Sequence, residues 1–252
     1  MTTKIPKRLR REPLVEAIWQ AVFDTTSTIS PPGDLLVGII YSWLHKSNYH
    51  WQFQRLATAD IPAFLSAQDP HLRFTAKYRI ESPKSPIVYQ IGDRIISVHC
   101  RRPYTGWEVF RDKIIDLQQL LSETAVIPSP FYQSLRYINL IEQQDMSDLR
   151  GLRLAIRLGD QDVINQPIHF RIETNYYNFT HILQIATHAH VRLAENQSME
   201  GTVIDLETRA VSSPNWSDQR DQLEAIHLAA KTMFFEQVVA DDLVCRLQPE
   251  YE

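Results

Sequence analysis

The feature that most constrains the fold of this chain is a plan of strands closed by a long amphipathic helix, which occurs twice. The first stretch opens on an alternating apolar segment, residues 14–23, and closes at residues 106–122, where apolar side chains recur every three or four positions. The second opens at residues 133–142 and closes on a helix that begins within residues 215–218 and runs to about residue 239. This pattern predicts an α+β protein of two similar halves, each an antiparallel sheet with helices packed on one face. The alternative to such a pseudo-duplication is chance, because α+β chains often end in helices.

Alternating or short apolar runs, bounded by turn residues, predict the strands of both halves. In the first half they predict strands at residues 50–56, 72–80, 87–90 and 94–100, in addition to the opening strand. Residues 25–32 have the composition of a loop, residues 35–44 of a helix, and residues 61–67 of a short helical connector. In the second half the predicted strands are residues 149–158, 169–176, 181–192 and 201–210, and the first of these is a strand because Leu152, Leu154 and Ile156 alternate with other residues.

A proline-rich segment divides the two predicted halves. Pro128-Ser129-Pro130 follows the first closing helix and precedes the second opening strand. We therefore predict a basic N-terminal arm at residues 1–12, a first α+β half at residues 13–127 and a second at residues 128–252.

Composition and cysteine usage exclude several classes of protein. The longest strongly apolar run, residues 35–44, is half the length that a membrane-spanning helix needs. The basic N-terminus lacks the apolar core of a secretion signal, so we expect a cytoplasmic protein without membrane contact. Cys100 and Cys245 do not form a CxxC pair, which argues against a disulfide framework and a cysteine-based zinc module.

The net charge of −4 conceals an asymmetry along the chain. Five of the 26 basic residues lie among the first eleven positions, which leaves 21 basic against 30 acidic residues elsewhere. An acidic body disfavours broad electrostatic binding of nucleic acid. The arm itself is a candidate contact for RNA, DNA or an acidic partner, and its alternative role is a solubilising terminus. Its basic residues are Lys4, Lys7, Arg8, Arg10 and Arg11.

Three polar residues of the opening strands are candidates for an interface between the halves. Glu16 and Arg136 occupy similar places in their strands and could form a charge-assisted contact, or could be two separate rim residues. Asn139 lies in an otherwise apolar strand, where a buried amide must find hydrogen-bond partners.

Histidines supply the candidate catalytic groups. His188 and His190 lie on one face of a predicted strand, and Glu173 on a neighbouring strand could add a carboxylate, with His169 or His181 as further ligands. This set predicts a metal-dependent hydrolase only if it converges, and two histidines on an exposed sheet face are the alternative. General acid–base chemistry on RNA by His99 or His188 is a further possibility.

No motif of the sequence points to a cofactor. The chain has neither a GxGxxG nor a GxxxxGK[ST] loop, and it lacks the GxSxG elbow of serine hydrolases. We therefore expect no cofactor. The sequence also has no ordered metal-ligand motif, so we predict no metal site from a motif.

Four stretches carry a resemblance that together touches most of the chain. They are Pro13-Leu14-Val15-Glu16-Ala17-Ile18, Tyr104-Thr105-Gly106-Trp107 with Phe110, Leu135-Arg136-Tyr137-Ile138-Asn139, and Ile226-His227 to Phe234-Phe235-Glu236. The chain resembles a conserved hypothetical bacterial family that is sporadically distributed and has no established activity. The patchy occurrence of that family is similar to that of mobile defence or toxin–antitoxin genes, so the resemblance implies such a setting.

The sequence as a whole favours a non-catalytic cytoplasmic adaptor that binds a protein partner, within a bacterial defence or toxin–antitoxin module. The first alternative is a nucleic-acid-binding or RNA-processing protein that uses the basic arm and a histidine. The second alternative is a metal-dependent hydrolase at His188 and His190.

Overall fold

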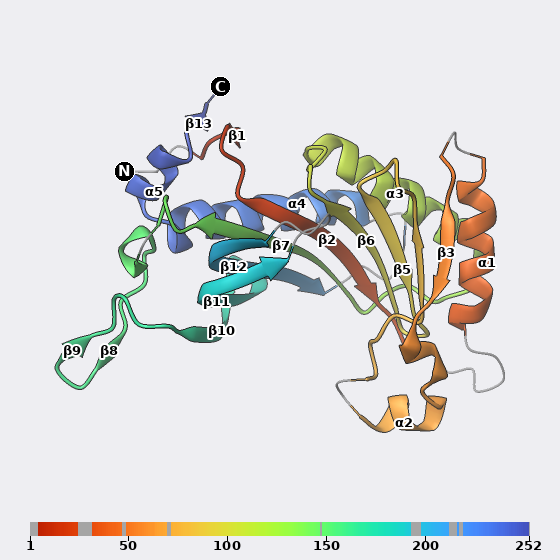
Figure 1. The fold of residues 1–252 in the computed structure, drawn as a ribbon. Coiled ribbons are helices and arrows are strands. Elements are labelled where there is room, and N and C mark those ends of the chain that lie inside the picture. The colour runs from red at the N-terminus through yellow and green to blue at the C-terminus, as the bar shows by residue number, and fades with distance from the viewer. Residues whose placement is uncertain are drawn as a thin grey trace. The chain divides into compact units, whose positions relative to one another are not determined.

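The computed structural model describes residues 5–24, 32–46, 49–69, 72–146, 148–192, 198–211, 216 and 219–251. Hydrogen bonds join nine strands into one large sheet in the order β10-β11-β12-β7-β2-β6-β5-β4-β3 (Figure 1). The described part of the chain is therefore α+β, as predicted. Its strands are β1 (Arg8–Leu9), β2 (Leu14–Val22), β3 (Gln52–Arg55), β4 (Tyr78–Glu81), β5 (Ile87–Ile91), β6 (Ile95–Arg101), β7 (Tyr132–Glu142), β8 (Arg157–Leu158), β9 (Gln161–Asp162), β10 (His169–Tyr176), β11 (Phe179–Arg192), β12 (Ser198–Val211) and β13 (Pro249–Glu250).

The helices are distributed along the whole chain. They are α1 (Pro32–Leu44), α2 (Ala63–Gln68), α3 (Trp107–Thr124), α4 (Gln219–Thr232) and α5 (Asp241–Arg246), with 3-10 turns at Ala57–Asp60 and Leu149–Gly151 and a π-helix at Met233–Val238. Within the described ranges, no helix has both the length and the apolar character that crossing a membrane requires.

The chain folds into two compact units that interleave in sequence. Unit 1 comprises residues 1–15, 136–208 and 225–252, and unit 2 comprises residues 16–135 and 209–224. The predicted repetition of one plan in two halves is not confirmed, and the predicted boundaries at residues 12/13 and 127/128 stay a prediction.

The sheet of unit 2 has one apolar face because its antiparallel strands alternate in register. Trp19 pairs with Val98, Val98 with Tyr89, and Tyr89 with Ile80, which places all four side chains on the same face. All four are fully buried. Helices α1 and α3 cover this face, and they supply further fully buried side chains, Leu36, Ile40, Phe110, Ile114, Leu117 and Leu121.

Helix α3 has the apolar stripe that its sequence predicts. Phe110, Ile114, Leu117 and Leu121 recur at helical spacing and are completely buried. The helix ends at Ala125, whose left-handed φ of 50° lets its N–H donate to the carbonyl of Leu121. Burial of four large side chains along one stripe holds the helix on the sheet.

Unit 1 contains a long hairpin, β10–β11, and a core formed with the C-terminal helices. The hairpin turns at Tyr177 and Asn178, which both have positive φ, as a two-residue turn between right-twisted strands requires. The core draws on strands β7, β11 and β12 and on the last helices, and consists of Ile141, Met146, Leu149, Leu152, Leu183, Ile185, Ile204, Leu206, Met233, Phe234, Phe235, Val238, Val239, Leu243, Val244 and Leu247.

Three predicted elements differ from the structure. The strand predicted at residues 149–158 is wrong. Leu152 donates its N–H within a 3-10 turn and forms an isolated bridge with Val239, and a strand is present only at the two residues of β8. The alternation there reflects the docking of Leu152, and of half-buried Leu154, onto the core. The strand predicted at residues 72–80 is confined to β4, and the strand predicted at residues 50–56 shortens to β3.

The final helix changes its winding where the sequence predicts one continuous stripe. Helix α4 ends at Thr232, and the chain continues as a π-helix through Val238. The predicted buried residues Leu223, Ile226, Ala230 and Val238 are nonetheless buried. Most of the predicted loop at residues 25–32, and most of the predicted start of the final helix at residues 215–218, lie outside the described residues.

Candidate functional site

A hydrogen-bonded chain of three polar side chains lies on the sheet face of unit 2 opposite α1 and α3. Strand β2 pairs with β6 so that Ile18 opposes His99 and Gln20 opposes Ser97. Glu16 lies two residues before Ile18 and shares its face. His99 Nδ1 is 2.9 Å from Glu16 Oε1, and His99 Nε2 is 2.9 Å from Ser97 Oγ. The register of two neighbouring strands is what brings the three groups together.

This geometry determines which nitrogen of a neutral His99 carries the proton. An ionised carboxylate can only accept, so Nδ1 donates to Glu16 and Nε2 accepts from the hydroxyl of Ser97. The order hydroxyl, imidazole and carboxylate is that of a serine hydrolase triad. Ser97 was not among the residues predicted from the sequence, although the Ser-x-His spacing on a strand was a usable signal.

The enclosure of this group argues against catalysis. Ser97 is only 6% exposed and His99 only 9%. Neither residue lines either of the two hollows described below. A nucleophile needs room for a substrate carbonyl about 3 Å from its oxygen. We therefore interpret the chain of hydrogen bonds as a buried polar network that satisfies its own members.

The structure gives Glu16 and Arg136 each a partner within its own unit. In unit 2, Arg101 lies 4.0 Å from Glu16 and donates to Glu81 at 3.0 Å. In unit 1, Arg136 forms a bidentate pair with Asp205, with N–O distances of 2.7 and 2.5 Å. The predicted contact between Glu16 and Arg136 stays a prediction. Asn139 is buried in β7, as its apolar surroundings in the sequence indicate.

The basic arm is part of a small sheet in unit 1, because β1 pairs antiparallel with β13. The side chains of Arg8 and Arg10 both contact Glu250, at 2.8 and 2.7 Å, and Arg11 contacts Asp145 at 2.5 Å. The hydrogen bond from Arg10 and the two guanidinium charges lower the pKa of Glu250.

These contacts limit what the arm can offer to a phosphate. Arg8 remains 71% exposed, but it shares one carboxylate with Arg10. The N–H of Lys7 is taken by the carbonyl of Glu250, and Lys4 lies outside the described residues. The described arm is thus a paired strand whose arginines already face acidic groups.

The predicted cluster of His188, His190 and Glu173 does not converge. Glu173 of β10 pairs with Ile182 of β11. Ile182 lies six residues before His188 on β11. At about 3.4 Å per residue, the two side chains start roughly 20 Å apart. Glu173 instead lies 3.6 Å from Arg171. Among the described residues, no group of three or more His, Cys, Asp or Glu side chains is placed to hold a metal ion.

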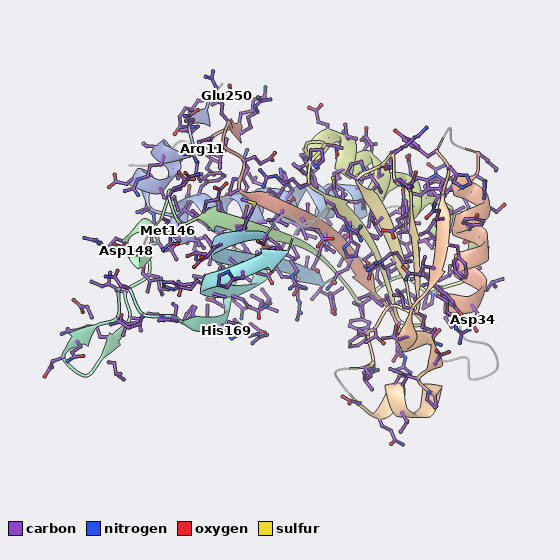
Figure 2. The ribbon with its side chains drawn as sticks, in the orientation of Figure 1. Arg11, Asp34, Met146, Asp148, His169 and Glu250 are labelled. Carbon is purple, nitrogen blue, oxygen red and sulfur yellow. The ribbon has the colours of Figure 1, made fainter. Side chains whose placement is uncertain are left out.

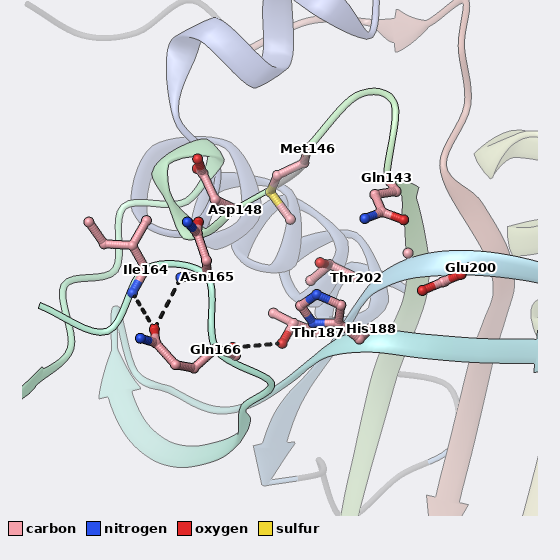
Figure 3. A pocket seen from close by; sticks show the side chains of 11 residues that line it. Gln143, Met146, Asp148, Ile164, Asn165, Gln166, Thr187, His188, Glu200 and Thr202 are labelled. Carbon is pink, nitrogen blue, oxygen red and sulfur yellow. Dashed lines mark hydrogen bonds between the residues drawn. The ribbon is translucent and has the colours of Figure 1, made fainter.

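His188 itself lines a small hollow of unit 1, together with Asp148, Glu200 and Thr202 (Figure 3). Its φ of 54° is uncommon for a residue with a side chain and departs from strand geometry. The cavity volume is about 20 Å³, which is room for a single water molecule. Asp148 is held by Arg150, whose hydrogen bonds lower the pKa of that carboxyl. A hollow of this size cannot receive an organic substrate.

A second hollow is an open groove in unit 2 with a volume of about 520 Å³. It runs along the outer side of α1, and we call it the α1 groove. Asp34 lies near one end of α1 (Figure 2), and Lys46 lies just beyond the other end. The groove is lined by Asp34, Leu35, Gly38, Ile39, Ser42, Trp43 and Lys46, and by Leu120 of α3.

The α1 groove has an apolar floor and a polar rim. Leu35 is 55% exposed, and Ile39, Trp43 and Leu120 are half-buried. Asp34 accepts a hydrogen bond from the hydroxyl of Tyr78. Burial, followed by this hydrogen bond, raises the pKa of Tyr78 to about 12, so the hydroxyl stays protonated and continues to donate. The lining therefore combines exposed apolar surface with carboxylate, hydroxyl and ammonium groups.

Gly38 deepens the groove at its middle. A Cβ atom placed there would meet no heavy atom of the described residues within 4 Å, so no contact among those residues explains the glycine. Glycine in a helix interior costs about 0.5–1 kcal/mol relative to alanine. No contact among the described residues offsets this cost. We therefore treat the open space above Gly38 as part of the groove.

The fold and these sites were compared with known proteins. No protein-family model matches the chain, and no curated protein matches its sequence. The resemblance to a sporadically distributed bacterial family therefore stays a prediction.

Proposed function

We propose that this chain is a non-catalytic protein-interaction protein, an adaptor, and that the α1 groove is its binding surface. The observation that carries the proposal is the exposed apolar floor of this groove, on the outer side of a helix whose inner side is already buried.

Helix α1 has more apolar surface than its own unit covers. Its inner side buries Leu36, Val37, Ile40 and Leu44 against the sheet. Its outer side still presents Leu35 with half of its surface exposed. A surface helix normally has a polar outer face, and a helix that is apolar all round is normally covered on all sides. The outer side of α1 therefore has the character of a surface that receives a partner.

The layout of the groove supports a protein as the partner. Protein interfaces have an apolar, often aromatic centre within a polar rim. Trp43 supplies an aromatic side chain at the floor, and tryptophan is among the residues that contribute most to binding energy. Asp34, Ser42 and Lys46 supply the rim. Contiguous exposed apolar surface rimmed by polar groups marks interaction sites.

The other two predicted functions have less support. Glu173 lies far along the hairpin from His188 and His190, the histidines proposed for metal chemistry. His99 is buried beside Ser97. The arginines of the basic arm contact Glu250 and Asp145. The bacterial, cytoplasmic setting and the link to a defence or toxin–antitoxin module are parts of this proposal that rest on the sequence and its resemblance.

Affinity purification of two matched variants from the native host tests the proposal. Leu35→Asp places a charge in the groove, whereas Leu228→Asp makes the same change at an exposed position of α4, where Leu228 is 61% exposed. We expect a stoichiometric protein to co-purify at low salt with the wild type and with Leu228→Asp, and to be lost from Leu35→Asp. Equal retention by both variants, or a nuclease-sensitive excess of absorbance at 260 nm in place of a protein, would contradict the proposal.

A further inference from the structure

We infer that the partner of the α1 groove is a second copy of this chain, whose α1 lies antiparallel across the first in a symmetric dimer. The inference rests on the proposed function, because it names the occupant of the same groove. Two features of the groove carry it, the placement of its charges and the placement of its small residues.

The charges of the groove complement themselves under a twofold rotation. Asp34 and Lys46 lie 12 positions apart, which is about 18 Å along a helix. If two copies of α1 cross antiparallel around position 40, each Asp34 faces the Lys46 of the other copy. A parallel pair would instead place like charges together, which is unfavourable. A symmetric dimer therefore contains two equivalent ion pairs between Asp34 and Lys46, one at each end of the groove.

Both charged groups have capacity for such a contact. The side chain of Lys46 is exposed and has no partner among the contacts of the described residues. Asp34 is also exposed and uses one carboxylate oxygen, Oδ1, to accept from Tyr78. The hydrogen bond orients the carboxylate and leaves its second oxygen for an ammonium group.

The small residues obey the same symmetry as the charges. Gly38 and Ser42 are equally distant from position 40, so an antiparallel crossing places Gly38 of each copy opposite Ser42 of the other. Small side chains at a crossing point let two helices approach closely. The open space above Gly38 is then filled by the partner helix. Leu35, Ile39 and Trp43 flank this point and become the apolar part of the interface.

The size of the groove sets the expected strength of the dimer. One helix from each copy covers less surface than the roughly 1,200–2,000 Å² of a stable interface, so the association should be weak. We expect a dissociation constant of about 1–100 µM. The dimer should weaken as salt is added, because the two ion pairs lie at its rim.

Analytical ultracentrifugation of the full chain with charge-reversal variants tests the inference. Asp34→Lys and Lys46→Asp each place like charges together in a homodimer, so each variant alone should dimerise at least tenfold more weakly. An equimolar mixture of the two should form a heterodimer, because all four charges are then complementary. The double variant should dimerise like the wild type. Lys84→Asp, at an exposed turn outside the groove, is the matched control and should leave the dimer unchanged.

The outcomes separate this inference from the proposed function. A wild type that stays monomeric at about 10 times the upper expected dissociation constant overturns self-association. So does a dimer that both single reversals leave intact, since its interface would lie elsewhere. If the chain is monomeric but Leu35→Asp still loses a captured protein, the groove binds a different protein and the proposed function stands. Circular dichroism of each variant checks that folding is preserved, and the mixing experiment needs only that both single variants fold.

Discussion

At the scale of single residues, the charge state of His181 is tied to folding. It lies in β11 with no exposed surface, and its Nδ1 is 2.9 Å from Thr208 Oγ1. Its Nε2 has no hydrogen-bond partner among the described residues. Burial, which penalises the charged imidazolium, lowers the pKa of His181 below its ordinary value near 6.5.

The lowered pKa of His181 predicts a protein that loses stability on acidification. In the pH range between the lowered native pKa and about 6.5, the unfolded chain binds a proton that the native protein does not. The free energy of unfolding should therefore be highest above pH 6.5 and should fall below it, by at most about 1.4 kcal/mol per pH unit from this group. Urea unfolding of the wild type and His181→Gln between pH 5 and pH 7.5 measures the difference.

The control for this experiment is His190→Gln, which changes an exposed histidine of the same strand. It should keep the pH dependence of the wild type, whereas His181→Gln should have a flatter one. Identical slopes in His181→Gln and the wild type would show that other groups cause any acid sensitivity.

The reactivity of the Ser97 hydroxyl distinguishes a structural hydrogen-bond network from an active site. If the hydroxyl only satisfies His99, a fluorophosphonate probe should not label the folded protein. Ser97→Ala should lower the free energy of unfolding by about 1–3 kcal/mol, because it leaves a buried imidazole nitrogen without its partner. Ser122→Ala, at an exposed position of α3, should change stability by less than about 0.5 kcal/mol. Stoichiometric labelling that maps to Ser97 would instead make this group catalytic and contradict the non-catalytic proposal.

At the scale of elements, helix α1 has a glycine on its inner side, which packs within unit 2, and another on its outer side, which lines the α1 groove. Its inner side contains Gly33, where a Cβ atom would come within 2.8 Å of Asp93 and 3.0 Å of the backbone of Gly92. Its outer side contains Gly38, where a Cβ atom would meet no atom of the part of the chain that the structure describes. The first glycine permits close packing inside unit 2, and the second is free for contact with another molecule.

This difference predicts opposite effects of the same substitution within one helix. Gly38→Ala should raise the free energy of unfolding by about 0.4–1 kcal/mol, because it restricts the unfolded chain and creates no clash. Gly33→Ala should lower it by about 1–3 kcal/mol, because the methyl group has no room. Thermal unfolding followed by tryptophan fluorescence at about 0.1 µM protein, below the expected dissociation constant of the dimer, gives both values. A Gly38→Ala protein less stable than the wild type would mean that the outer side of α1 is already covered within the chain.

At the scale of the whole molecule, each unit is assembled from segments that are far apart in sequence. In unit 1, Arg10, which directly follows β1, contacts Glu250 of β13 across 240 positions of the chain. In unit 2, Arg111 of α3 and Glu224 of α4 are 3.1 Å apart across 113 positions. The spacing of residues in the sequence does not reveal such contacts. The sequence therefore did not predict that the two units interleave.

The sequence by itself determined most elements and the buried side of each long helix. Alternation indicated β2, β7 and β10, and helical spacing indicated the buried stripe of α3, because side-chain direction follows directly from backbone period. The same rule failed at residues 149–158, where alternating leucines dock onto a core without forming a ladder.

Only the tertiary structure decided which faces of different elements meet. Ser97, His99 and Glu16 form a chain because β2 and β6 are neighbours in one register, and a period of two residues does not specify a neighbour. His188 and Glu173 stay apart for the same reason, since the hairpin register places Glu173 opposite Ile182. The α1 groove exists because sheet packing buries one side of an almost wholly apolar helix and leaves the other side exposed. Local chemistry is encoded residue by residue, whereas the meeting of distant residues depends on how the strands and helices pack.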